Sequence, residues 1–187
     1  MAVPTVEFHQ FATSGLDPFI YDYGALASSG YVGIVNDTSA GALAFGTINA
    51  DISTASDTKV VIMRATDMGG NAFIRNMRFW GPDLIQAGLI TYKQGIVGSG
   101  DWAQDATIAS LEVATPGLTD DVSATLPTTP NLLRRDGFTA ISGVTAAEAS
   151  QWVYLNLDVG SSVGAGNYGG TNGQGILRYR VTFDYGK

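Results

Sequence analysis

Two stretches near the end of the chain decide its fold: Gln151–Val159 (QWVYLNLDV) and Ile176–Tyr185 (ILRYRVTFDY). Every second residue in both stretches is large and apolar, and Arg178, Arg180 and Asp184 lie in the opposite phase of the second. A side-chain period of two is typical of a strand that covers a core with one face. We therefore expect two strands whose inward residues share one core. These residues include Leu155, Leu157, Val181 and Phe183.

Other apolar runs, separated by turn residues, predict further strands. Val3–Phe11 is expected to be an edge strand or to have Pro4 at its start, because Pro4 cannot donate a ladder hydrogen bond. The Met68–Asn71 turn (MGGN) joins the runs Lys59–Ala65 and Ala72–Trp80 into a predicted hairpin, and Gly81–Asp83 (GPD) is expected to end the second of them. The other later runs are Ala42–Ile52, Leu89–Ile96 and Ile108–Val113.

Helix signals are nearly absent. The capping-box spacing of Thr145 and Glu148 supports at most one short turn of helix. The sequence therefore predicts an all-β fold: an antiparallel β-sandwich or jelly roll with long loops and at most one short helix. The length of 187 residues fits a single β-sandwich domain over residues 1–187, in which an extended segment over residues 1–25 can pack on a neighbour.

Composition and charge argue against several kinds of partner and site. Charged residues make up only 14% of the chain, against roughly 25% in typical domains, and a surface so poor in charge is often one that is covered. The net charge of −7 argues against nucleic acid or an anionic membrane as partner. No cysteine is present, so disulfides and thiolate sites are excluded. The N-terminus has no signal-peptide pattern, and no run approaches the roughly 18 apolar residues of a membrane span, so we expect a soluble protein made in the cytoplasm.

Two glycine motifs fail on their context. Gly164–Gly169 matches G-x-G-x-x-G and Gly160–Gly164 matches G-x-S-x-G, with Ser162 at the centre of the second. The dinucleotide fingerprint and the nucleophile elbow both require a helix to follow, whereas a strand is expected here. The only histidine, His9, lies far upstream and has no second histidine or cysteine to form a relay or metal site. We therefore expect no catalytic residue, no cofactor and no metal.

Charged pairs offer weaker candidates. Asp101 with Asp105, or Asp120 with Asp121, could contribute to a calcium site or a glycosidase pair, but such pairs need a shared cleft that spacing does not establish. The Asp101/Asp105 loop lacks the alternating ligands of an EF-hand, and we interpret it as a solvated turn. The dipeptide Arg134–Arg135 is most simply a solvated loop pair.

Aromatic side chains are the best candidates for an interface. Trp80, Trp102 and Trp152 could form a glycan-stacking platform, but core and interface packing is the commoner use of such rings. Trp152 and Tyr154 occupy the outer phase of their strand, so a loop or another subunit is expected to cover them. The segments Leu16–Tyr23, Ala114–Asp136 and Gly160–Gly175 combine little charge with irregular backbone and are predicted contact regions. The possible interface residues are Phe19, Tyr21, Tyr23, Trp152, Tyr154 and Tyr168.

Several of these patterns together resemble small β-sandwich virion proteins of tailed phages. The similar features are the Gln151–Leu155 strand (QWVYL), the Gly/Ser loop after it, and the closing strand that ends in Asp184–Gly186 (DYG). Lys59–Ala65 and Ile74–Trp80 similarly match the paired central strands of such proteins. The resemblance implies a virion location and a structural role as a capsid decoration, cement or tail-associated subunit that binds copies of itself and a shell or tube protein.

Two other classes of function stay open. A subunit of an extracellular filament held by strand exchange would also combine low charge with long irregular segments. A carbohydrate-binding β-sandwich module would require exposed, coplanar Trp or Tyr rings, and the sequence does not establish their exposure.

Overall fold

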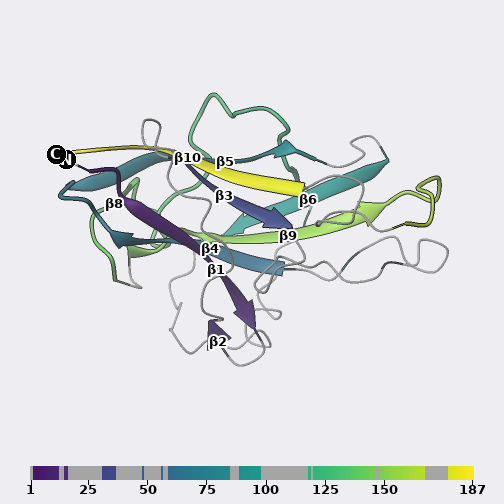
Figure 1. The fold of residues 1–187 in the computed structure, drawn as a ribbon, viewed down its shortest axis with the longest axis horizontal. Helices are drawn as coiled ribbons and strands as arrows, with labels where there is room; N and C mark the ends of the chain where they lie inside the picture. The colour runs from purple at the N-terminus through teal and green to yellow at the C-terminus, as the bar shows by residue number, and fades with distance from the viewer. Residues whose placement is uncertain are drawn as a thin grey trace.

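A computed structural model describes residues 2–12, 15–16, 31–36, 48, 56, 59–84, 89–97, 118, 120–145, 148–166 and 177–187. These residues form ten strands and no α-helix, which confirms the all-β prediction (Figure 1). No helix in this part of the chain is long and apolar enough to cross a membrane. The strands are β1 (Thr5–Ala12), β2 (Gly15–Leu16), β3 (Tyr31–Asn36), β4 (Lys59–Asp67), β5 (Phe73–Asp83), β6 (Ile90–Val97), β7 (Asp120–Asp121), β8 (Ala140–Ile141), β9 (Trp152–Val159) and β10 (Leu177–Gly186).

The strands form two antiparallel sheets. One has six strands in the order β2-β1-β4-β9-β6-β7, and the other has four in the order β3-β10-β5-β8. From β2 to β6, and again from β7 to β10, each strand lies in the opposite sheet to the one before it. This alternation favours the jelly-roll form of a sandwich over a simple meander. The first and last described residues lie side by side at one end of the molecule (Figure 1).

One hydrophobic core lies between the two sheets. As the sequence predicted, Leu155 from the six-stranded sheet and Val181 and Phe183 from the four-stranded sheet are buried in it, with Leu157 packed at its margin. Alternation of side chains along β9 and β10 points one face of each strand into this layer. The rings of Phe79 and Tyr179 stack within it, with centroids 5.6 Å apart. Other core residues are Val6, Val61, Met63, Ala65, Ile74, Met77, Ile90, Tyr92, Val122, Leu132, Ile141 and Val153.

The predicted hairpin between β4 and β5 is wrong, because these strands belong to different sheets. Gly69 and Gly70 both have positive φ, 61° and 78°, and the turn that they form carries the chain across the sandwich. A side chain at Gly69 would place its Cβ 2.6 Å from the Ala2 carbonyl oxygen. Asn71 Nδ2 donates to that same oxygen at 2.7 Å and to the Met68 oxygen at 2.6 Å, which fixes the turn against the N-terminus.

Strand β5 is longer and less regular than its sequence predicted. It continues to Asp83, so the expectation that Gly81–Asp83 ends it is wrong. Its register with β10 shifts twice, because β5 advances three residues between Arg75 and Arg78, and again between Trp80 and Asp83, where β10 advances two. Asn76 lies in the first irregularity with φ 54°, a left-handed conformation that asparagine tolerates. Each shift accommodates one extra residue of β5. The second shift contains Gly81 and Pro82, and the strand continues past them to Asp83.

The free edge of β5 is covered by the Pro-rich segment that follows β7. Gly81 N donates to the Ser123 oxygen at 2.8 Å. The side-chain amide of Asn131 imitates a neighbouring strand: its Oδ1 accepts from Phe79 N at 2.6 Å and its Nδ2 donates to the Phe79 oxygen at 2.8 Å. Strand β8 then pairs with the start of β5. These contacts satisfy backbone groups that an open edge would expose.

Other sequence predictions have mixed outcomes. Val3–Phe11 and Leu89–Ile96 correspond to β1 and β6, whereas Ala42–Ile52, apart from Ile48, and Ile108–Val113 lie outside the described residues. The expectation of at most one short turn at Thr145 and Glu148 is confirmed, since Glu148 N donates to the Thr145 oxygen at 3.0 Å in a single turn. The Glu148 carboxylate accepts hydrogen bonds from Arg134 and Ser142.

Candidate functional site

The outer face of the four-stranded sheet is the most unusual surface in the described part of the chain. On β10 the outward residues alternate with buried Val181 and Phe183. Register places Asp184 opposite Arg75, Thr182 opposite Arg78, and Arg180 opposite Trp80. We call the resulting set the arginine face. Its members are Arg75, Arg78, Trp80, Arg180, Thr182 and Asp184.

The irregularity at Asn76 brings the arginines together. In a regular strand, Arg75 and Arg78 would lie on opposite faces because they are three residues apart. Asn76 is the extra residue, and it shifts the alternation of side chains after it by one position. Met77 and Phe79 therefore point into the core, and half-buried Arg78 lies on the same side as exposed Arg75. Asn76 in the middle of the strand was the available signal for this bulge.

Aromatic rings support the guanidinium groups. The Arg75 guanidinium carbon lies 4.3 Å from the centroid of the Phe73 ring, and that of Arg180 lies 5.9 Å from the Trp80 centroid. Such contacts are worth about 0.5–1 kcal/mol at exposed sites, and they orient the cation without neutralising it. Trp80 Nε1 donates to Thr182 Oγ1 at 3.4 Å, which ties the two strands together on this face.

Two arginines of the arginine face, Arg75 and Arg78, are not paired with a carboxylate in the described part of the chain. Asp184 Oδ2 accepts a hydrogen bond from Asn76 Nδ2 at 2.7 Å rather than from Arg75, the residue opposite it. Among the described residues, neither Arg75 nor Arg78 has a carboxylate partner. Arg78 Nε is buried and has no hydrogen-bond acceptor there either. In a protein of net charge −7, uncompensated arginines on a sheet face are chemically suited to bind an anionic partner.

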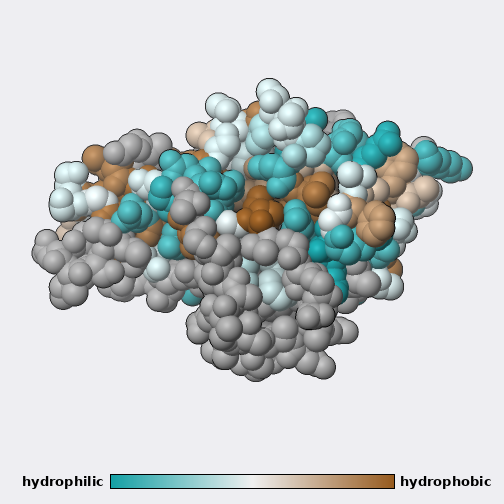
Figure 2. Space-filling model, turned by 180° about the vertical axis from the view of Figure 1, so that it is seen from behind, coloured by the Kyte–Doolittle hydropathy of each residue, from teal (hydrophilic) through white to brown (hydrophobic). Residues whose placement is uncertain are grey.

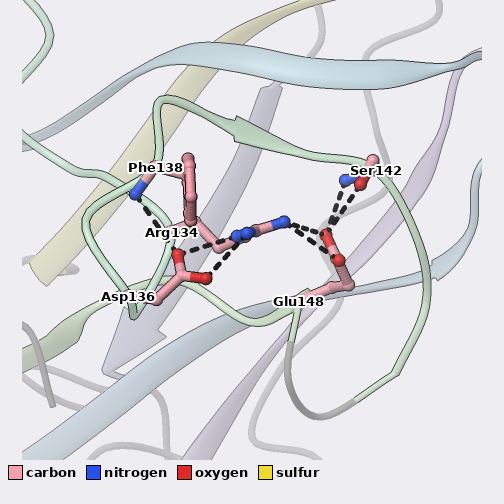
Figure 3. A network of polar contacts seen from close by, with 5 residues as sticks. All are labelled: Arg134, Asp136, Phe138, Ser142 and Glu148. Carbon is pink, nitrogen blue, oxygen red and sulfur yellow. Dashed lines mark hydrogen bonds and ion pairs between the residues drawn. The ribbon is translucent and has the colours of Figure 1, made fainter. Parts of the chain in front are cut away.

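A second arginine cluster shows the opposite arrangement (Figure 3). Arg134 donates to both Asp136 oxygens at 2.8 and 2.7 Å and to both Glu148 oxygens at 3.0 Å. Glu148 Oε2 also accepts from Ser142 N at 2.8 Å and Ser142 Oγ at 3.1 Å. The Arg134 side chain is only 16% exposed, so the interpretation of Arg134–Arg135 as a solvated loop pair is wrong for Arg134. Its partners are loop residues that folding brings to it.

Electrostatics in this cluster reflect mutual stabilisation. The hydrogen bond to Asp136 raises the pKa of Arg134 further, and the same bond lowers the pKa of Asp136. Burial alone would raise the pKa of Glu148, but hydrogen bonds from Ser142 and Arg134 outweigh it and lower that pKa. All three groups are therefore held in their charged forms. The cluster joins the segment after β7 to the segment before β9, and the charge of Arg134 is paired with two carboxylates of the same chain.

The predicted interface residues fare differently from the arginine face. Trp152 and Tyr154 are 6% and 1% exposed on the outer face of the six-stranded sheet, where Ile62 is buried as well. These three residues are covered within the chain, and burial raises the pKa of Tyr154 to about 12. Neither ring is available at the surface. The remaining candidates, Phe19, Tyr21, Tyr23 and Tyr168, lie outside the described residues.

The predicted contact segments are described only in part. Residues 120–136 contribute buried Val122 and Leu132 to the chain's own core, so this part of the Ala114–Asp136 segment serves the fold. In the Gly160–Gly175 segment, Gly160 N donates to the Leu89 oxygen at 2.9 Å and Val163 packs against the core. Of Leu16–Tyr23, only Leu16 is described.

The chemical motifs do not form a site. Ser162 lies in an exposed turn after β9, and no helix follows it within the described residues up to Gly166. Asp120 and Asp121 form β7, where Asp121 pairs with Lys93 at 2.6 Å. His9 lies on β1, and its side chain is outside the description, as are Asp101 and Asp105. The described chain holds no cluster of three or more potential metal ligands.

Exposed apolar side chains do not form a competing patch on the side of the molecule that Figure 2 shows. Its hydrophobic areas are small and separated by hydrophilic ones over the described atoms. The exposed large hydrophobic residues of the described chain are Leu89, Leu126, Phe138 and Val144. Of these, Phe138 packs its ring beneath the Arg134 guanidinium, 4.6 Å from its centroid.

No protein-family model matches this chain, and no significant match was found among curated proteins or solved structures. Function must therefore be argued from the arginine face and the fold that carries it.

Proposed function

We propose that this protein is a non-enzymatic structural subunit of a phage virion, either a capsid decoration or cement protein or a tail-associated subunit, which assembles in many copies. The observation that carries the proposal is the arginine face: a sheet surface with uncompensated Arg75 and Arg78 on an otherwise acidic protein. Complementary charge gives an interface its orientation and specificity. A virion assembled in the host cytoplasm is the location that follows.

The resemblance of β9 and β10 to strands of small virion proteins supports this choice. The buried residues Ile62, Trp152 and Tyr154 on the outer face of the six-stranded sheet also support it, because this part of the sheet is packed on both sides within one subunit. Such a subunit is a rigid block that presents its other sheet to partners. Rigid partners lose little conformational entropy when they dock.

A filament subunit held by strand exchange is the second candidate, and the covered edge of β5 weighs against it. Strand exchange needs a sheet edge whose N–H and C=O groups can accept a foreign strand. Ser123, Asn131 and Ala140–Ile141 already occupy that edge from Ile74 to Gly81. At the other side of this sheet, β3 is the last strand in the described part of the chain.

A carbohydrate-binding module is the third candidate. Glycan stacking needs exposed, coplanar aromatic rings. Trp152 is buried, Trp80 is half-buried next to Arg180, and Trp102 lies outside the described residues. The described tryptophans therefore favour packing over sugar binding.

Electron microscopy combined with mass measurement tests the proposal. The purified full-length chain should form particles of defined copy number, and on incubation with capsids or tails of its source it should bind at a fixed ratio to the shell or tube protein. Binding to glycan arrays by a strictly monomeric chain would favour the carbohydrate-binding module instead. Unbranched homopolymers of unlimited length that ignore capsids and tails would favour the filament.

A further inference from the structure

We propose that the arginine face is one half of a head-to-tail contact between copies of this chain and that it binds a carboxylate-bearing surface of the next copy. The inference rests on the proposed function in one respect, namely that the subunit assembles with itself. It adds which surface is used, which chemistry it recognises and what symmetry the contact has.

Like charge disfavours a contact in which two arginine faces meet each other. In a two-fold symmetric contact, each residue of the patch meets the same patch on the partner. Arg75 and Arg78 of one copy would be brought to those of the other, with Asp184 as the one carboxylate among the members of the face. Like charges brought together oppose association. A contact between different surfaces is therefore favoured.

The rest of the chain supplies the complementary charge. All ten lysines and arginines lie from Lys59 onward, whereas residues 13–58 contain five carboxylates and residues 98–119 contain three, with no lysine or arginine in either range. Among the described residues, exposed Asp120 and Asp158 belong to the six-stranded sheet, opposite the arginine face. Outside its own arginine face, a second copy therefore carries more carboxylates than lysines and arginines.

The geometry of the arginine face suits carboxylates. Guanidinium groups bind carboxylates through two parallel hydrogen bonds, and a pre-oriented fork loses less entropy on binding. Arg75 is exposed and held over the Phe73 ring, and Arg78 next to it is half-buried with its Nε unsatisfied. Strand pairing fixes the spacing of their backbones, so the face offers a rigid pair of cations.

Head-to-tail contacts generate rings when the rotation closes and open chains when it does not. In both cases a copy with a defective arginine face still presents its carboxylates. Such a copy can join a growing assembly but cannot extend it on the other side. It therefore terminates assembly when mixed with the wild type, a behaviour that symmetric face-to-face contacts do not produce.

The test measures self-association of the full-length chain by sedimentation velocity over a range of concentrations, at low and high salt. We expect association that weakens as salt is raised. Arg75→Glu, at an exposed position, should weaken it by about tenfold or more, and Arg75→Ala should weaken it less in the same direction. Lys187→Glu, an equal change of charge at another exposed position, should leave it within about twofold of the wild type. Circular dichroism and thermal unfolding establish that all three variants fold.

Mixing gives the sharper readout. Arg75→Glu added to the wild type at about one part in ten should lower the mean assembly mass, since each variant copy ends a chain or breaks a ring. If Arg75→Glu associates like Lys187→Glu, the inference is overturned and the proposed structural role stands. If the wild type is monomeric at every concentration, both are overturned. Arginine-dependent binding to single-stranded DNA without self-association would overturn the head-to-tail contact in favour of a nucleic-acid surface.

Discussion

Two regions of this protein use arginine in opposite ways. Arg134 lies between Asp136 and Glu148, which together accept four of its hydrogen bonds, whereas Arg75 and Arg78 have no carboxylate partner among the described residues. The first arrangement joins two loops of the same chain. The second leaves positive charge on a sheet face of an acidic protein. The difference indicates which arginines serve the fold and which are available to a partner.

Sequence distance explains part of this difference. Asp136 and Glu148 are only 2 and 14 residues from Arg134, so the loops that fold around it bring their own counter-charges. On the arginine face, the carboxylate opposite Arg75 comes from β10, more than a hundred residues later, and it is bound to Asn76. The bulge at Asn76 places Arg75 and Arg78 on the same face, and the side-chain amide of Asn76 also donates a hydrogen bond to Asp184, the carboxylate opposite Arg75.

The largest predicted effect concerns the buried side of β10, which the arginine face requires. Phe183 is 2% exposed in the core, so Phe183→Ala should lower the free energy of unfolding by about 3–5 kcal/mol. Arg180→Ala, on the opposite side of the same strand, should cost far less. Urea unfolding of the three proteins measures both changes. Equal destabilisation would mean that the two faces of β10 are interchanged and that no arginine face exists.

The next effect separates the two kinds of arginine. Arg134→Ala removes the shared partner of Asp136 and Glu148, and we expect a loss of about 2 kcal/mol because hydrogen bonds to partly buried charges disappear. Arg75→Ala should stay within about 0.5 kcal/mol of the wild type in the isolated subunit, as is usual for an exposed residue without a charged partner. Comparable losses in the two variants would contradict the distinction between them.

A smaller effect is the acid sensitivity of the Arg134 cluster. The folded chain lowers the pKa of Asp136 and of Glu148 below their ordinary values of 3.8 and 4.5. Their contribution to stability is therefore fully present above those ordinary values and is lost as pH falls through the lower pKa values of the folded state. Between about pH 5 and pH 3, the wild type should lose more stability than Arg134→Ala. Arg75→Ala should follow the wild type, and a wild-type slope in Arg134→Ala would contradict the assignment.

Periodicity was sufficient for the fold class but not for the topology. Alternation along Gln151–Val159 and Ile176–Tyr185 correctly predicted β9, β10 and their shared core. The pairing of β4 with β5 was wrong because a short turn does not distinguish a hairpin from a crossing between sheets, and the two positive-φ glycines permit the crossing. Pairing depends on contacts between distant strands, which local sequence does not encode.

The candidate site was predictable only on one of its strands. The phase of β10 predicted that Arg180 and Asp184 face away from the core. The sequence did not predict that Arg75 and Arg78 share a face, because strict alternation places them on opposite faces. The bulge at Asn76 brings them to the same side. Arg134 was misread for a related reason, since its decisive partner Glu148 comes from another loop. The sequence predicted that Trp152 and Tyr154 are covered by a loop or by another subunit, and in the structure they are buried within the chain itself.

The smallest expected effect is zero, and it belongs to Ser162, which lies in neither arginine region. This serine occupies an exposed turn in a glycine-rich loop where a G-x-S-x-G match arises from composition, and a nucleophile elbow would instead hold it in a strained strand-to-helix turn. Ser162→Ala should therefore leave stability, self-association and the hydrolysis of p-nitrophenyl acetate unchanged. The wild type should hydrolyse this ester no faster than Arg75→Ala or Arg134→Ala does. Turnover that disappears in Ser162→Ala but persists in Arg75→Ala would reveal an enzyme and would remove the ground for treating the arginine face as the functional surface.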